Sequence, residues 1–122
     1  MPERERLLAI CREWVVKAEN DLTNAAHVLK LGEACPTDTV CFHAQQCVEK
    51  YVKAIALLPA KSRPRLTAEE QGRLTQYATG ARYPGWGEIP LAEAHRALAI
   101  ARRVRREVRG VLPQGVLRRG RP

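Results

Sequence analysis

Hydrophobic positions recur along the chain at steps of three and four residues, the spacing of one face of an α-helix. The first stripe runs through residues 4–31 and stops at Gly32, a residue typical of helix C-termini. Its members are Leu7, Cys11, Trp14, Ala18, Leu22, Ala25 and Leu29. The pattern predicts one long amphipathic helix over residues 4–31, with Trp14 in the core.

A second helix is predicted from the loop EACPTD to about Leu58, with Thr37 or Asp38 as its N-cap. Its apolar positions form two adjacent stripes, which indicates burial against more than one neighbour. These positions are Val40, Cys41, Ala44, Cys47, Val48, Tyr51, Val52, Ala54 and Ile55.

Two further helices follow the proline-punctuated link PAKSRPRL. Thr67 and Glu70 have the spacing of a capping box, which predicts a short helix over residues 68–79. Pro90 suits the first turn of a last helix over residues 91–112. No segment alternates apolar and polar residues as a strand does. The fold class predicted is all-α, an antiparallel four-helix up-and-down bundle with room for a short additional helix.

The chain of 122 residues has the length of one domain. We expect a helical bundle over residues 1–112 and a flexible basic tail over residues 113–122. Two long helices with wide apolar faces favour a symmetric homodimer, which would cover the remaining apolar surface. No apolar run is long enough to span a bilayer, and the charged start MPERERLLAICREW does not resemble a signal peptide. We therefore expect a cytoplasmic protein without membrane association.

Three of the four cysteines fall on apolar helical positions, and no Cys or His spacing typical of a metal site occurs. Buried, reduced thiols are expected, with no metal and no cofactor.

The net charge of +8 is concentrated near the C-terminus, where residues 102–109 read RRVRREVR. Such a cluster attracts phosphates and acidic proteins, but it is also compatible with a solvated helix end whose arginines complement the helix dipole. The candidate nucleic-acid contacts are Arg102, Arg103, Arg106 and Arg109.

Polar residues are crowded into the otherwise apolar stretch CFHAQQCVEKYVKA, residues 41–54. Helical spacing places one set on a single strip: His43, Gln46, Lys50 and Lys53. Gln45 and Glu49 form a neighbouring pair. The strip is either a solvent face laced by ion pairs or a binding site.

The same stretch, with W-x3-A-x2-D at Trp14, Ala18 and Asp21 and with ARYPG at residues 81–85, resembles the HEPN family. The resemblance extends from Trp14 to about Leu112. It implies a four- or five-helix bundle that commonly dimerises. It also implies a role in two-component, toxin–antitoxin-like systems in which a small nucleotidyltransferase is encoded nearby, and a link to nucleotides. We expect Asp21, beside the apolar stripe of its helix, to pair with Lys50 or Arg82 across the bundle.

The signature positions then become the expected ligand- or partner-binding site. These residues are Gln45, Gln46, Glu49, Lys50, Lys53, Arg82 and Tyr83.

The sequence departs from the family in two places, and the first lowers the expectation of ribonuclease activity. Ribonuclease members carry an arginine four to six residues before a histidine, and no histidine here has that spacing. The candidate catalytic residues for an atypical site, built across the dimer, are His43, Arg82 and His95. Similar members also carry a stretch such as P-x-T-H-D-L after the second helix, whereas here KAIALL passes directly to PAKSRPRL.

Three functional hypotheses follow, in this order. The first is a nucleotide- and partner-binding module of a nucleotidyltransferase–HEPN pair, either non-enzymatic or only weakly active. The second is an atypical HEPN ribonuclease toxin, and the third is a basic bundle that binds nucleic acid.

Overall fold

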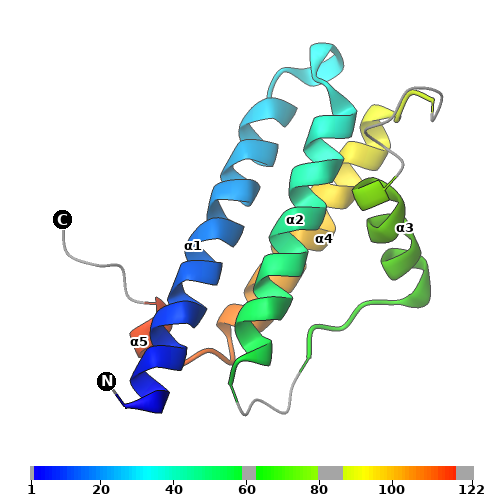
Figure 1. The fold of residues 1–122 in the computed structure, drawn as a ribbon. Coiled ribbons are helices and arrows are strands. Elements are labelled where there is room, and N and C mark those ends of the chain that lie inside the picture. Colours follow the sequence, from blue (N-terminus) through cyan, green and yellow to red (C-terminus); the bar gives the residue numbers. More distant parts are fainter. Residues whose placement is uncertain (1, 59–62, 80–86, 118–122) are drawn as a thin grey trace.

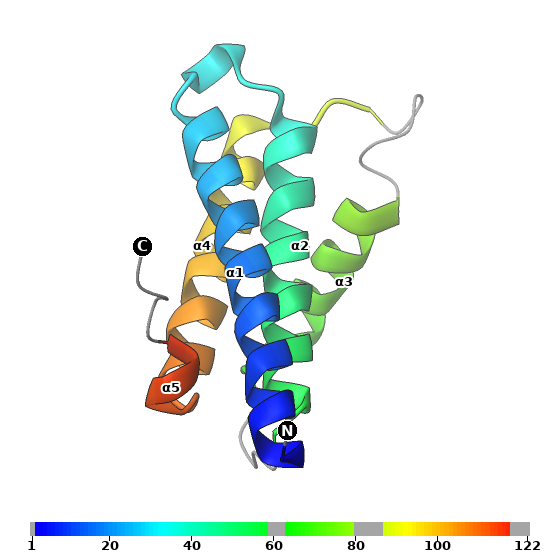
Figure 2. The ribbon, with the colours of Figure 1, turned by 60° about the vertical axis from the view of Figure 1, so that its left-hand side comes forward.

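The computed structural model describes residues 2–58, 63–79 and 87–117. The elements run in the order α1 (Glu3–Leu29), a short 3-10 turn (Gly32–Ala34), α2 (Thr37–Ala56), α3 (Ala68–Thr79), α4 (Leu91–Arg109) and α5 (Gln114–Leu117). Figures 1 and 2 show α1 to α4 running alternately up and down. The described residues contain no strand, and the predicted all-α bundle is confirmed.

The central helix of the bundle is α2. It packs most extensively against α1 and also contacts α4 and the shorter α3, which explains the width of its apolar face. The helices approach each other closely because many of the fully buried side chains are small. Alanines without exposed surface lie on three helices: Ala18, Ala25, Ala44, Ala54, Ala94, Ala97 and Ala101.

The ends of the first two helices differ in detail from the prediction. The helix α1 ends at Leu29, and Gly32 then takes a positive φ of 65°, as a glycine stop requires. Pro36 occupies the N-cap position of α2, so the predicted cap by Thr37 or Asp38 is wrong. The Thr37 hydroxyl instead donates to the Ile89 carbonyl at 2.6 Å. It thereby ties the start of α2 to the segment that leads into α4.

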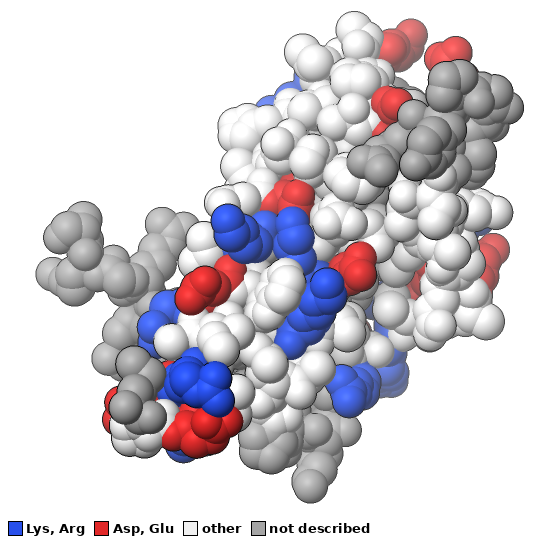
Figure 3. Space-filling model, in the orientation of Figure 1, with Lys and Arg blue, Asp and Glu red and all other residues white. Residues whose placement is uncertain are grey.

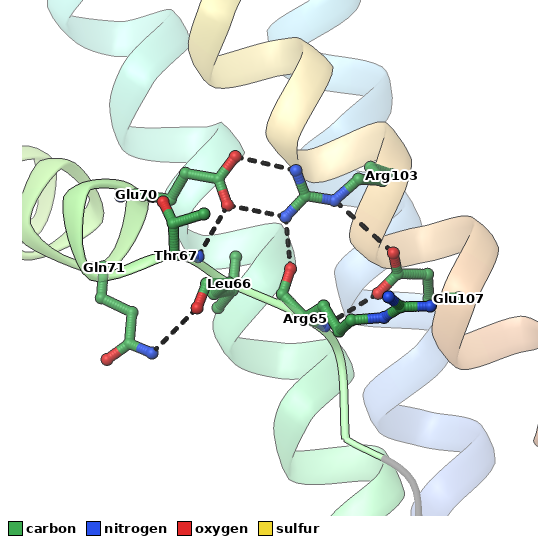
Figure 4. A network of polar contacts seen from close by, with 7 residues as sticks. All are labelled: Arg65, Leu66, Thr67, Glu70, Gln71, Arg103 and Glu107. Carbon is green, nitrogen blue, oxygen red and sulfur yellow. Dashed lines mark hydrogen bonds and ion pairs between the residues drawn. The ribbon is translucent and has the colours of Figure 1, made fainter.

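The predicted capping box at the start of α3 is confirmed. The Glu70 amide donates to the Thr67 hydroxyl and the Thr67 amide donates to Glu70 Oε1, both at 3.0 Å. Arg103 of α4 donates from both terminal nitrogens to the same Glu70 carboxylate at 2.8 Å (Figure 4). Arg103 also binds the Arg65 carbonyl at 2.5 Å, so one guanidinium holds both α3 and the link before it.

The C-terminal part of the chain is folded beyond the predicted boundary at residue 112. Pro90 is the N-cap of α4 rather than a residue of its first turn, and α4 ends at Arg109. Within the expected tail, α5 packs on α1 with Val116 buried, and Arg12 donates to the Gly115 carbonyl at 2.8 Å. Residues 118–122 lie outside the described residues.

Most apolar side chains are covered within the single chain. Among the described residues the exposed large apolar side chains are Val16, Leu31 and Val111. The excess of apolar surface that favoured a homodimer is therefore small here, and the homodimer stays a prediction.

Candidate functional site

A buried carboxylate on α1 organises polar residues of α2. Asp21 is 8% exposed; its Oδ1 lies 2.7 Å from His43 Nδ1, and its Oδ2 accepts from Lys50 Nζ at 2.5 Å. His43 and Lys50 are seven residues apart, about two helical turns, so both reach the same face of α1. The expected pairing of Asp21 with Lys50 is confirmed.

His43 is held in one orientation by this contact and by the ring of Phe42, which meets it edge-on at a centroid distance of 5.4 Å. Because Nδ1 is engaged by Asp21, the opposite nitrogen, Nε2, is the one left to exchange a proton or a hydrogen bond with another molecule. The His43 side chain is 25% exposed, enough to be reached from solvent.

A second row of contacts runs along the neighbouring face of α2. Gln46 Nε2 donates to Gln45 Oε1 at 2.8 Å, and Gln45 Nε2 donates to Glu49 Oε2 at 2.9 Å. Gln45 is itself buried. Its amide therefore orients Gln46 and Glu49 and is less available to a ligand than the sequence suggested.

Lys53 closes this row. Its Nζ lies 4.0 Å from Glu49 Oε1 and 4.9 Å from the centre of the Trp14 ring, a cation–π geometry. Trp14 is half-buried rather than part of the core, in contrast to the prediction. The side chains of Lys53 and Glu49 are about half exposed and form the accessible edge of the row.

The structure thus brings the predicted α2 residues together in one polar surface beside α1. We call it the α2 strip, and its members are His43, Gln45, Gln46, Glu49, Lys50 and Lys53. Arg82 and Tyr83, predicted to join the same site, lie outside the described residues. His95 is exposed on α4 and takes part in no described hydrogen bond or ion pair.

Residues 11–66 match the HEPN domain family. This segment of the chain is similar to the HEPN domain. The match covers Asp21 and the whole α2 strip, whereas the ARYPG stretch lies beyond it. No curated protein and no solved structure shows a match to this chain.

A second carboxylate of α1 joins three helices of the bundle. Glu19 accepts a hydrogen bond from the hydroxyl of Tyr51 on α2 and one from Arg105 Nε on α4 at 2.7 Å. Burial alone would raise the pKa of Glu19, but the hydrogen bonds from Arg105 and Tyr51 outweigh it and the pKa is lowered. Burial and the bond to Glu19 raise the pKa of Tyr51, which keeps its proton.

The arginines predicted to contact nucleic acid fall into two groups. Arg103 faces α3 and contacts Glu70, Glu107 and the link. Arg102 and Arg106 are exposed, and Arg109 lies 3.4 Å from the Tyr51 hydroxyl. Arg105 belongs with this second group although the sequence analysis left it out; its spacing of three from Arg102 was the available signal.

A further polar cluster joins α3 to α4, where Glu93 accepts hydrogen bonds from Arg73 and from the hydroxyl of Tyr77. On the face seen in Figure 3, basic and acidic side chains are interspersed. Within the described ranges no group of three or more His, Cys, Asp or Glu could hold a metal ion. All four thiols are buried, and burial raises the pKa of Cys41 and Cys47 to about 12. None of the described helices has the length and apolar character of a membrane span.

Proposed function

We propose that this HEPN domain is a nucleotide- and partner-binding module of a two-component, toxin–antitoxin-like system. Its protein partner is a small nucleotidyltransferase encoded nearby, and the α2 strip is the contact surface. The observation that carries the proposal is the preorganisation of the strip: each of its polar groups is oriented by a neighbour before any partner arrives.

The contacts of the strip lower the entropic cost of binding. Lys53 is positioned over Trp14 and beside Glu49, so its ammonium group is already restricted. Gln46 is oriented by Gln45, and one side of its amide stays available because the described contact uses only its nitrogen. A partner with complementary charges would meet a fixed pattern of one cation, one anion and one amide, which favours specificity.

The test is calorimetric titration of the chain with the small nucleotidyltransferase encoded beside it. The variant Gln46→Ala/Lys53→Ala should bind at least about tenfold more weakly, since charged hydrogen bonds contribute roughly 1.5–3 kcal/mol each. The matched control is Lys30→Ala, which removes an exposed lysine at the end of α1, away from the strip. Absence of a complex, or equal affinity of the double variant and the control, would refute the proposal.

One observation favours a second candidate, RNA cleavage. The Asp21 carboxylate fixes His43 by its Nδ1, an arrangement that suits a general acid or base acting through Nε2. The ribonuclease spacing of arginine and histidine is absent from the sequence, which ranks this candidate second.

A further inference from the structure

Four arginines of α4 gather around one hollow. Arg102, Arg106 and Arg109 recur at steps of four and three residues and so form a single stripe, and Arg105 lies beside it. Together with Leu22 of α1 and Gly110 they line an open hollow of about 530 Å³. The stripe rises by about 10 Å along the helix axis, the length of two helical turns.

The positive charge in this hollow is only partly compensated. Glu19 is the described carboxylate that reaches these arginines: Arg105 Nε lies 2.7 Å and Arg109 Nη1 lies 4.0 Å from its Oε2. Arg102 and Arg106 form no ion pair with any described carboxylate. Arg103, one position away on the helix, shows the contrast, because its guanidinium is occupied by Glu70, Glu107 and a backbone carbonyl.

The helix dipole explains only part of this arrangement. Arg106 and Arg109 lie in the last turn of α4, where cations are favoured, but Arg102 lies a full turn before that. The four guanidinium groups around this hollow repel one another, and Glu19 offsets the charge of Arg105 and Arg109 only. Leu22, half-buried in the floor, excludes water from one side and would strengthen the contacts of an anion bound there.

We propose that this hollow binds two or more phosphate groups at once, either the linked phosphates of a nucleoside triphosphate or successive phosphates of an RNA backbone. The planar guanidinium fork matches phosphate oxygens with paired hydrogen bonds, and a stripe of this length can hold more than one phosphate. Glu19 binds Arg105 through Nε, so this contact does not use the two terminal nitrogens of Arg105.

The hollow is lined by residues of α4 with Leu22 of α1, whereas the α2 strip belongs to α2. In the view of Figure 2, α4 and α2 appear on opposite sides of α1. The inference therefore stands apart from the proposed protein partner. Loss of phosphate binding through α4 variants and loss of partner binding through α2 variants can be measured separately.

The test uses the full chain and three probes: inorganic tripolyphosphate, ATP and a short single-stranded RNA, each titrated by calorimetry at low salt. Wild-type protein should bind tripolyphosphate saturably, with one site per chain. The variant Arg102→Gln/Arg106→Gln should bind at least about tenfold more weakly, because it removes two charged donors. Neither arginine forms a described ion pair, so the melting temperature should stay close to that of the wild type.

Arg96→Gln is the matched control, an exposed arginine on another face of the same helix. It should bind tripolyphosphate like the wild type. Three results would each overturn the inference: no saturable binding, equal binding by the double variant, or an equal loss in the control. The source of the phosphates follows from the other probes. Tighter binding of ATP than of tripolyphosphate, at the same site by competition, indicates a nucleotide, whereas affinity that grows with RNA length indicates the backbone.

Discussion

Lys50 of α2 lies 2.5 Å from Asp21 of α1, and the Asp21 side chain is only 10% exposed. Removing the lysine leaves a largely buried carboxylate with His43 as its remaining described partner. We therefore expect Lys50→Ala to lower the free energy of unfolding by about 1–3 kcal/mol. Urea denaturation measures this value.

The comparison variant is Lys53→Ala, whose lysine is half exposed and should cost less than about 1 kcal/mol. Equal losses of unfolding free energy in the two lysine variants would contradict a stabilising ion pair between Lys50 and Asp21. The pair Asp21→Asn/Lys50→Ala should cost less than the sum of its single substitutions, because the unpaired carboxylate is gone.

The loss of folding stability at acid pH should depend on Glu70. The hydrogen bonds from Arg103, with that from the Thr67 amide, lower the pKa of Glu70 to about 2 from an ordinary value of 4.5. A lowered pKa means that the stabilisation is complete above the unfolded-state value and is lost as the pH falls toward 2. Between about pH 5 and pH 2, the melting temperature of Glu70→Gln should fall less with decreasing pH than that of the wild type.

Glu13→Gln is the matched control for this titration, since it removes an exposed carboxylate that takes part in no described ion pair. If the melting temperatures of the wild type and of Glu70→Gln fell equally with pH, the network around Glu70 would contribute nothing to acid stability.

Purified protein alone should leave both structured and single-stranded RNA intact, because the arginine–histidine spacing of HEPN ribonucleases is absent. Gel analysis after prolonged incubation tests this. Cleavage that disappears in both His43→Ala and Arg82→Ala would promote the ribonuclease to the leading function.

The homodimer predicted from the sequence can be tested by light scattering at micromolar concentration. The expected mass is about twice the 13.7 kDa of one chain. A single species with the mass of one chain would contradict the prediction, in keeping with the small exposed apolar surface of the described residues.

The helices could be predicted because their signals are local. Periodicity located α1 to α4, and the Thr67–Glu70 spacing alone fixed the start of α3. The cap of α2 could not be predicted, because the Thr37 hydroxyl binds Ile89, a residue far away in the sequence. The exposure of Trp14 was mispredicted for a similar reason. Periodicity shows which face of a helix points inward, but it does not show how far a side chain such as Trp14 is covered by its neighbours, here by Lys53.

The candidate site was predicted as a set of residues but not as a network. Helical spacing placed Lys50 on the strip, and the structure adds that its ammonium group forms an ion pair with Asp21. Gln45 matched the family signature, yet it is buried and acts on its neighbours. The sequence also could not show that Arg103 is paired with Glu70 whereas Arg102 is exposed, since this depends on which helix each side chain faces.

One oxygen of the Glu70 carboxylate, Oε1, both closes the first turn of α3 and receives Arg103 from α4. Initiation of this helix and its attachment to the bundle therefore share an atom, and one cannot be lost without weakening the other. The amides of α3 should accordingly exchange with deuterium as a single cooperative unit, at rates that Arg103→Gln raises throughout the helix rather than at its end alone.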